Sequence, residues 1–205
     1  MIGAGLLVVA VGSAVANAPG RGAQIRPEMV NAYVDAAAQL PSVVPECEGL
    51  TWQVIAGLGR VESRHARGSE IADDGSTDPW IIGPALDGSG AGGNTTPIYD
   101  TDLGRWDRDE EFDRAVGPMQ FIPTSWELYG TDGSGDDVAD PHNVRDAALS
   151  AAVHLCGFTP ADLSDPDELR RAVLRYNQSE DYADEVLEHA ERYTERYGPD
   201  GTELD

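Results

Sequence analysis

The sequence predicts an all-α domain. Apolar side chains recur at helical spacing in five or six segments, most of which open on a capping residue or a proline. No stretch shows the sustained apolar and polar alternation of a half-buried strand. A chain of 205 residues is long enough to bury one hydrophobic core, so we expect a single helical domain after a short leader.

The leader comprises residues 1–18, which are apolar and end in Ala16-Asn17-Ala18. Small residues in this pattern are typical of a signal-peptide cleavage site, although the basic residues that usually precede the apolar run are missing. We predict a signal peptide, with an uncleaved N-terminal anchor as the alternative. Residues 19–26 are predicted to be a linker, and the rest of the chain is predicted to be exported to the cell wall or the outer face of the cytoplasmic membrane.

Two helices are predicted next. The first runs from Pro27 to about Leu40, with Pro41 as its stop. The second follows the N-cap residue Thr51 and reaches Ser63. Its apolar stripe is formed by Val54, Ile55, Leu58 and Val61.

Glu62 lies at the margin of this stripe and close to the predicted helix end. Desolvation against the apolar face and the negative end of the helix dipole would both raise the pKa of its carboxyl group. A carboxyl that stays protonated near neutral pH can act as a general acid. The alternative is a surface glutamate near a helix end.

The segment 67–113 is rich in Gly, Asp, Ser, Thr and Pro and is predicted to be a long irregular insertion. Scattered aromatic residues, Trp80, Tyr99 and Trp106, suggest that it packs down at several points. We expect it to form one wall of a cleft, either as a lid or as a fixed wall.

The remaining elements are helices with clear start or stop signals. An extended or turn segment from Ala115 precedes them, and residues 199–205 form a tail. Their predicted bounds are Pro123 to Gly130, Asn143 to Cys156, Asp165 to Tyr176, and Ser179 to Gly198-Pro199.

Composition restricts the partners. The net charge is −23, from 37 acidic residues and 14 basic residues that are all arginine. Nucleic acids and anionic membranes require positive charge, so both are disfavoured. An uncharged or mixed-charge substrate, or a salt-rich or acid-tolerant source, is compatible with this balance.

The chain has two cysteines, Cys47 and Cys156. An even count in an exported protein predicts a disulfide, with two buried free thiols as the alternative. A metal pair is disfavoured because neither cysteine has a CxxC neighbour.

Three short motifs lie at predicted helix boundaries, where their side chains can converge on a cleft. They are VES at Val61–Ser63, GPMQFIPTSW at Gly117–Trp126, and YNQS at Tyr176–Ser179. Together, over residues 45–195, they resemble the lysozyme-like lytic transglycosylases of peptidoglycan, closest to the membrane-bound B type and its secreted actinobacterial relatives. The resemblance implies a goose-type lysozyme or lytic transglycosylase helical domain over residues 27–198, with 67–113 as the insertion.

The resemblance also implies the chemistry. Glu62 would be the sole acid/base: it protonates the β-1,4 glycosidic oxygen between N-acetylmuramic acid and N-acetylglucosamine, then takes the proton of the muramyl C6 hydroxyl as a 1,6-anhydro ring closes. Neither a cofactor nor a second carboxylate is demanded. The implied cleft residues are Ser63 and Gln120, which hydrogen-bond the substrate, Met119, which packs on a sugar, Tyr129, which lines the cleft, and Tyr176 and Asn177, which orient Glu62 and the saccharide.

A loop between two helices has oxygen ligands at alternate positions, in the manner of a calcium loop: Asp132, Ser134, Asp136, the carbonyl of Val138, and Asp140. Membrane-bound B-type relatives carry an EF-hand-like loop in the equivalent place. Here Asp137 replaces the turn glycine and Asn143 replaces the final Glu. We predict a structural Ca²⁺, with an acidic turn held by its own hydrogen bonds as the alternative.

Other chemistries find little support. The four histidines lack metal-ligand spacing, and no G-x-S-x-G nucleophile motif occurs. Three rival functions remain: a hydrolytic muramidase, a non-catalytic cell-wall glycan-binding protein, and a calcium-dependent structural partner of other wall enzymes. The predicted partners are peptidoglycan glycan strands, with a monomeric protein that could attach to a membrane only through residues 1–18.

Overall fold

The computed structural model describes residues 24–204. The predicted leader, residues 1–18, and the first part of the predicted linker lie outside the described residues. No helix within 24–204 is both long and apolar enough to cross a membrane.

Helices dominate the structure, and the predicted all-α fold class is confirmed. Each predicted helix is present within a few residues of its expected bounds. The helices are α1 (Pro27–Val43), α2 (Trp52–Ser63), α3 (Pro123–Tyr129), α4 (Val144–Cys156), α5 (Pro166–Tyr176) and α6 (Glu180–Arg196).

Six short strands form three two-stranded sheets that the sequence did not predict. At two to four residues each, they are too short to display an alternating pattern. The pairs are β1 (Cys47–Glu48) with β6 (Ala161–Asp162), parallel, and β2 (Glu70–Ile71) with β3 (Thr77–Asp78) and β4 (Ile82–Ala85) with β5 (Arg114–Val116), both antiparallel. A 3₁₀ turn, η1, occupies Ala91–Gly93.

The predicted stop at Pro41 is wrong, because α1 continues to Val43. A proline inside a helix loses its own N–H bond and crowds the carbonyl four residues earlier, and here this cost does not prevent two further helical residues. The following amide still bonds in helical fashion, from the N–H of Val44 to the carbonyl of Leu40 at 2.8 Å.

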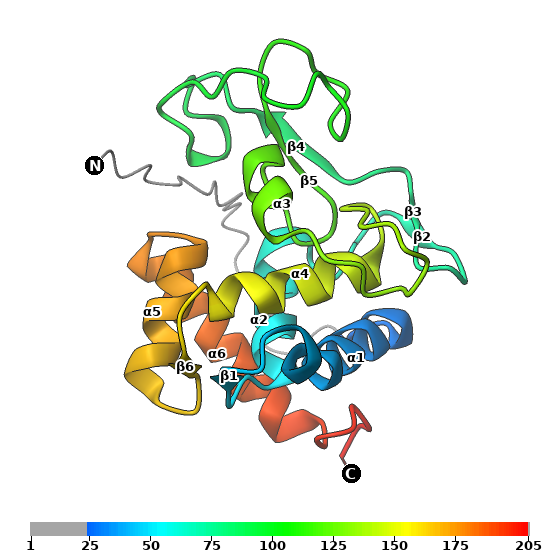
Figure 1. The fold of residues 1–205 in the computed structure, drawn as a ribbon, viewed down its shortest axis with the longest axis vertical. Coiled ribbons are helices and arrows are strands. Elements are labelled where there is room, and N and C mark those ends of the chain that lie inside the picture. The colour runs from blue at the N-terminus through cyan, green and yellow to red at the C-terminus, as the bar shows by residue number, and fades with distance from the viewer. Residues whose placement is uncertain (1–23, 205) are drawn as a thin grey trace.

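The helices gather around α2, while most of the irregular segment lies apart from them. The pairs α2–α6 and α1–α4 pack most extensively. Figure 1 shows β4, β5 and α3 on one side of α4 and helices α1, α2, α5 and α6 on the other. The predicted insertion is therefore organised into a lobe, and the residues from β5 through α3 connect that lobe to the helices.

A disulfide between Cys47 and Cys156 joins β1 to the last residue of α4, which confirms that prediction. The described end of the predicted linker also packs on the domain. Ile25 is buried, and the guanidinium of Arg26 donates to the carbonyl of Ser69 at 2.7 Å.

Candidate active site

Glu62 lies in the last turn of α2, where its side chain is buried with 8% of its surface exposed. Burial raises the pKa of the Glu62 carboxyl to about 8, from 4.5. The hydroxyl of Tyr182 donates a hydrogen bond to Oε1 of Glu62, and this bond opposes part of the rise because it favours the carboxylate. The carboxyl is thus largely protonated at neutral pH, as a general acid must be.

Tyr182 is the site residue that sequence reasoning missed. It lies in the first turn of α6, on the same buried face as Ala183 and Val186. That apolar face predicted a core residue, and nothing local in the sequence indicates that α6 packs against α2. The contact with Glu62 depends on that packing.

The second motif forms a tight turn between β5 and α3. Gly117 has φ +74°, and a Cβ there would lie 1.8 Å from the carbonyl oxygen of Pro141, so only glycine fits. The side-chain amide of Gln120, itself at φ +50°, donates to the Gly117 carbonyl at 2.9 Å. The turn is closed by a pair of backbone hydrogen bonds between Val116 and Phe121.

Tyr176, the last residue of α5, connects this turn to the acid. Its hydroxyl donates to the carbonyl of Met119 at 2.7 Å, and its pKa is raised first by burial and then by the nearby Glu62. Glu62 thus accepts its hydrogen bond from Tyr182, while the Tyr176 hydroxyl is bonded to the turn, and the orienting role of Tyr176 stays a prediction. Glu62, Met119, Tyr176 and Tyr182 are brought together from four separate stretches of the chain.

Asn177 and Ser63 flank this group. The Asn177 side chain is 4% exposed; its Oδ1 accepts from the amide of Ser179 at 3.1 Å, and its Nδ2 is buried with no partner in the described part of the chain. A buried donor without a partner is costly, and a substrate oxygen would satisfy it. The hydroxyl of half-buried Ser63 accepts from the amide of Ala66 at 2.8 Å and retains its own proton for donation.

Tyr129 is separated from Tyr176 by the ring of His154, whose centroid lies 4.7 Å from that of Tyr176. Tyr129 ends α3, where its ring stacks on His154 at 4.1 Å and on the exposed Phe158 at 5.2 Å. These stacking contacts do not include Glu62. Its predicted place in the cleft stays a prediction.

The predicted calcium loop is held together by hydrogen bonds of its own. Asp132 accepts from the amides of Gly135 and Asp137 at 2.7 and 2.8 Å, and the buried Asp146 accepts from the amides of Gly133, Ser134 and Asp140. Within residues 24–204, the one group of three acids whose ligand atoms lie within 4.8 Å of one another is Asp100, Asp102 and Asp113, in the irregular lobe. The carboxylates of Asp132, Asp136 and Asp140 are not gathered that closely, so the geometry gives the calcium prediction no support.

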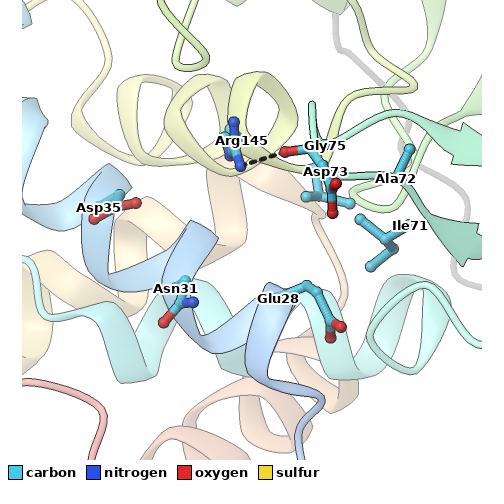
Figure 2. A pocket seen from close by; sticks show the side chains of 9 residues that line it. Glu28, Asn31, Asp35, Ile71, Ala72, Asp73, Gly75 and Arg145 are labelled. Carbon is cyan, nitrogen blue, oxygen red and sulfur yellow. Dashed lines mark hydrogen bonds between the residues drawn. The ribbon is translucent and has the colours of Figure 1, made fainter.

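A pocket of about 330 Å³ opens between α1, the β2–β3 turn and the start of α4, as Figure 2 shows. Acidic side chains face it from α1, and Arg145 donates to the carbonyl of Asp73 at 2.9 Å. The residues that line it are Glu28, Asn31, Asp35, Ile71, Ala72, Asp73, Gly75, Val144 and Arg145. It contains none of the predicted cleft residues and is a separate feature.

One segment of the chain matches a known protein family. Residues 113–158 match the family model described as the Transglycosylase SLT domain. No curated protein matches the chain. Two solved structures of the Escherichia coli lytic transglycosylase Slt35, one in complex with bulgecin A and one in complex with calcium, each align with a TM-score of 0.46 and 16% identity, over 82% of this chain and 74% of theirs.

The likeness to the solved structures is too distant to bear on the site. The family match is independent of that likeness and spans the turn at Gly117–Gln120, α3 and α4. Residues 113–158 are therefore similar to the transglycosylase SLT domain, in agreement with the family prediction made from the motifs.

Proposed function

We propose that this protein is a peptidoglycan lytic transglycosylase that cleaves the β-1,4 bond between N-acetylmuramic acid and N-acetylglucosamine, with Glu62 as its sole acid/base. The observation that carries the proposal is the buried Glu62 carboxyl, with a pKa of about 8, at the end of α2 and linked through Tyr176 to the turn of the SLT segment. Such a group holds a proton at neutral pH and can give it to a leaving oxygen.

The reaction needs two proton transfers at this one group. Glu62 first donates its proton to the glycosidic oxygen as the bond to the muramyl C1 breaks. The C6 hydroxyl of the same sugar then attacks C1, and the Glu62 carboxylate accepts the hydroxyl proton, which restores the acid. No water takes part in the reaction, so the muramyl product carries the newly formed 1,6-anhydro ring.

The surrounding groups support this cycle. Tyr182 donates to Glu62 and would stabilise the carboxylate formed after the first transfer. The unpartnered amide of Asn177, the Ser63 hydroxyl and the Gln120 amide are donors suited to sugar hydroxyl and acetamido oxygens. Met119, which the resemblance implied would pack on a sugar, is fully buried within the turn, so we propose that it supports the sugar-binding surface instead.

A hydrolytic muramidase is the rival reaction, and its products distinguish it. Enzymes that use water or a covalent intermediate place a second carboxylate opposite the acid. Among the described residues, the groups that shift the pKa of Glu62 include Tyr182 but no carboxylate. A single acid fits intramolecular closure of the ring.

The test is Glu62→Gln, assayed for release of muropeptides from purified peptidoglycan. The amide can still accept from Tyr182 but cannot transfer a proton, so release should fall at least a thousandfold with the melting temperature retained. Glu127→Gln, the same change at an exposed position of α3, is the control and should cleave like the wild type. Turnover by Glu62→Gln near the wild-type rate would overturn the proposed mechanism.

The finer predictions remain proposals. We propose that the protein is exported and acts in the cell wall as a monomer, with residues 1–18 as signal peptide or anchor. The disulfide supports export, because such bonds persist in oxidising compartments. A structural Ca²⁺ on the 132–140 loop also remains a proposal; it would need the loop carboxylates to rearrange around the ion.

A further inference from the structure

The chain takes an unfavourable path directly after Glu62. Three consecutive residues, Arg64, His65 and Ala66, have left-handed backbone angles, with φ of 54°, 61° and 56°. Residues other than glycine rarely adopt this conformation, and a run of three is held only where surrounding contacts impose it.

His65 makes the contacts that hold this turn. Its ring is buried, with 3% of the residue exposed. Nδ1 lies 3.0 Å from the hydroxyl of Tyr33 in α1, and Nε2 lies 2.8 Å from the hydroxyl of Tyr193 in α6. A neutral imidazole offers one donor and one acceptor, so one tyrosine donates to the ring and the other accepts from it.

The imidazole is neutral at every working pH. Burial lowers the pKa of His65 to about 3, and the nearby Arg60 and His189 act in the same direction. Glu62 is faced by Tyr176 and Tyr182. His65 is faced by Tyr33, Tyr193, Arg60 and His189. The network is therefore a fixed link that adds no charge beside the acid.

The turn is also bonded to the last turn of α2. The amide of His65 donates to the carbonyl of Gly59 at 2.9 Å, and the amide of Ala66 donates to the hydroxyl of Ser63 at 2.8 Å. Gly59 lets Tyr33 approach, because a Cβ there would lie 1.9 Å from the Tyr33 hydroxyl. Glu62 lies between Gly59 and Ser63, which these two hydrogen bonds join to the turn, so a displacement of His65 is transmitted to the backbone around Glu62.

We propose that His65 is a positioning residue: held by Tyr33 and Tyr193, it fixes the left-handed turn that follows Glu62 and so keeps the Glu62 carboxyl buried against Tyr182. Its meaning for catalysis rests on the proposed function. Helix α6 supplies both tyrosines: Tyr182 bonds Glu62 directly, and Tyr193 bonds His65, which follows Glu62 in the chain.

The first test is the double variant Tyr33→Phe with Tyr193→Phe, which keeps every ring and removes both hydroxyls. We expect kcat to fall about tenfold or more, with KM within twofold, because small displacements of a catalytic group are costly. Water should reach Glu62 more easily, so the loss of activity at alkaline pH should move to lower pH. Tyr197→Phe is the control: it removes a buried hydroxyl bonded to the Ile25 amide and should match the wild type.

A second pair of variants separates the side-chain contacts from the backbone turn. His65→Gly accepts the left-handed conformation but loses both hydrogen bonds, so it should fold and lose kcat. His65→Gln keeps one donor and one acceptor and should recover part of kcat. Wild-type kcat and pH profile in His65→Gly would overturn the proposal.

A measurement without substrate distinguishes this proposal from the proposed function. The pKa of the Glu62 carboxyl can be followed by ¹³C NMR in the wild type and in the double tyrosine variant. We expect a lower value in the variant, and the same value in both proteins would overturn the positioning role. Failure of the wild type to cleave peptidoglycan would instead overturn the proposed function, whatever the titration shows.

Discussion

At the scale of single residues, the chemistry depends on keeping one carboxyl neutral. Glu62 is buried and its ionised form is poorly solvated, which is why its pKa rises to about 8. The hydrogen bond from Tyr182 opposes part of that rise. The pKa of Glu62 is therefore set by two opposing effects, burial and the Tyr182 hydrogen bond, and substitutions can alter each of them separately.

Glu62→Gln should show the cost of this burial in stability. The folded-state pKa of about 8 lies above the ordinary 4.5, so the unfolded chain loses this proton first. As the pH rises from 4.5 to about 8, the free energy of unfolding of the wild type should therefore fall, by up to about 1.4 kcal/mol per pH unit. Glutamine removes this loss, so thermal unfolding should show the variant gaining on the wild type from pH 5 to pH 8. A constant difference would contradict the assigned burial.

Tyr182→Phe should raise the pKa of Glu62, whereas loss of the His65 contacts should lower it. Without the hydroxyl, the carboxylate loses its donor and the pKa of Glu62 should rise further. We expect a lower kcat, since the carboxylate intermediate is less stabilised, with the alkaline fall in rate moved to higher pH. A pH–rate profile that moves to lower pH would contradict the role given to Tyr182.

The burial of Glu62 could be predicted because its signal is local: an acid at the edge of an apolar stripe near a helix end. Tyr182 could not, since its signal is the packing of α6 on α2. The resemblance implied that Tyr176 orients Glu62, and the structure adds that the Tyr176 hydroxyl bonds the carbonyl of Met119. The environment of a single side chain was thus easier to predict than its hydrogen-bond partners.

At the scale of elements, caps and periodicity predicted the helices well. Asn143, Asp165 and Ser179 each accept hydrogen bonds from amides in the first turn of the helix that follows, as N-caps do. Thr51 makes no such side-chain bond, and α2 starts there nonetheless. The strands were not predictable, because pairing between distant short segments leaves no periodic trace.

The disulfide should be a major source of stability. It spans a separation of 109 residues, and the chain-entropy model gives about 4–5 kcal/mol for a loop of that length. The double variant Cys47→Ser with Cys156→Ser should lower the denaturant midpoint accordingly. Wild-type protein under reducing conditions is the matched comparison, and equal midpoints in all three samples would contradict this contribution.

Calcium binding to the 132–140 loop can be tested by thermal unfolding with and without a chelator. If the proposed site is real, chelation should lower the melting temperature of the wild type, and Asp132→Asn should abolish that shift. Asp102→Asn, in the separate cluster of the irregular lobe, is the control. A shift that Asp102→Asn removes and Asp132→Asn preserves would contradict the loop as the site.

At the scale of the molecule, the candidate site is assembled from segments far apart in the sequence. Glu62 ends α2, the Gly117–Gln120 turn follows β5, and Tyr176 and Tyr182 belong to α5 and α6. The order of three motifs indicated that they converge, and the fold explains how. The net charge of −23 disfavours polyanionic partners but does not indicate how the site is assembled.

The most direct test of the central claim is mass spectrometry of muropeptides released from purified peptidoglycan by the purified protein. Intramolecular closure predicts products with 1,6-anhydro ends, each lighter by one water than the hydrolytic product. Glu62→Gln, run in parallel, should release neither. Products with reducing ends would contradict the transglycosylase reaction, because they require a water molecule and a base that the proposed site does not use.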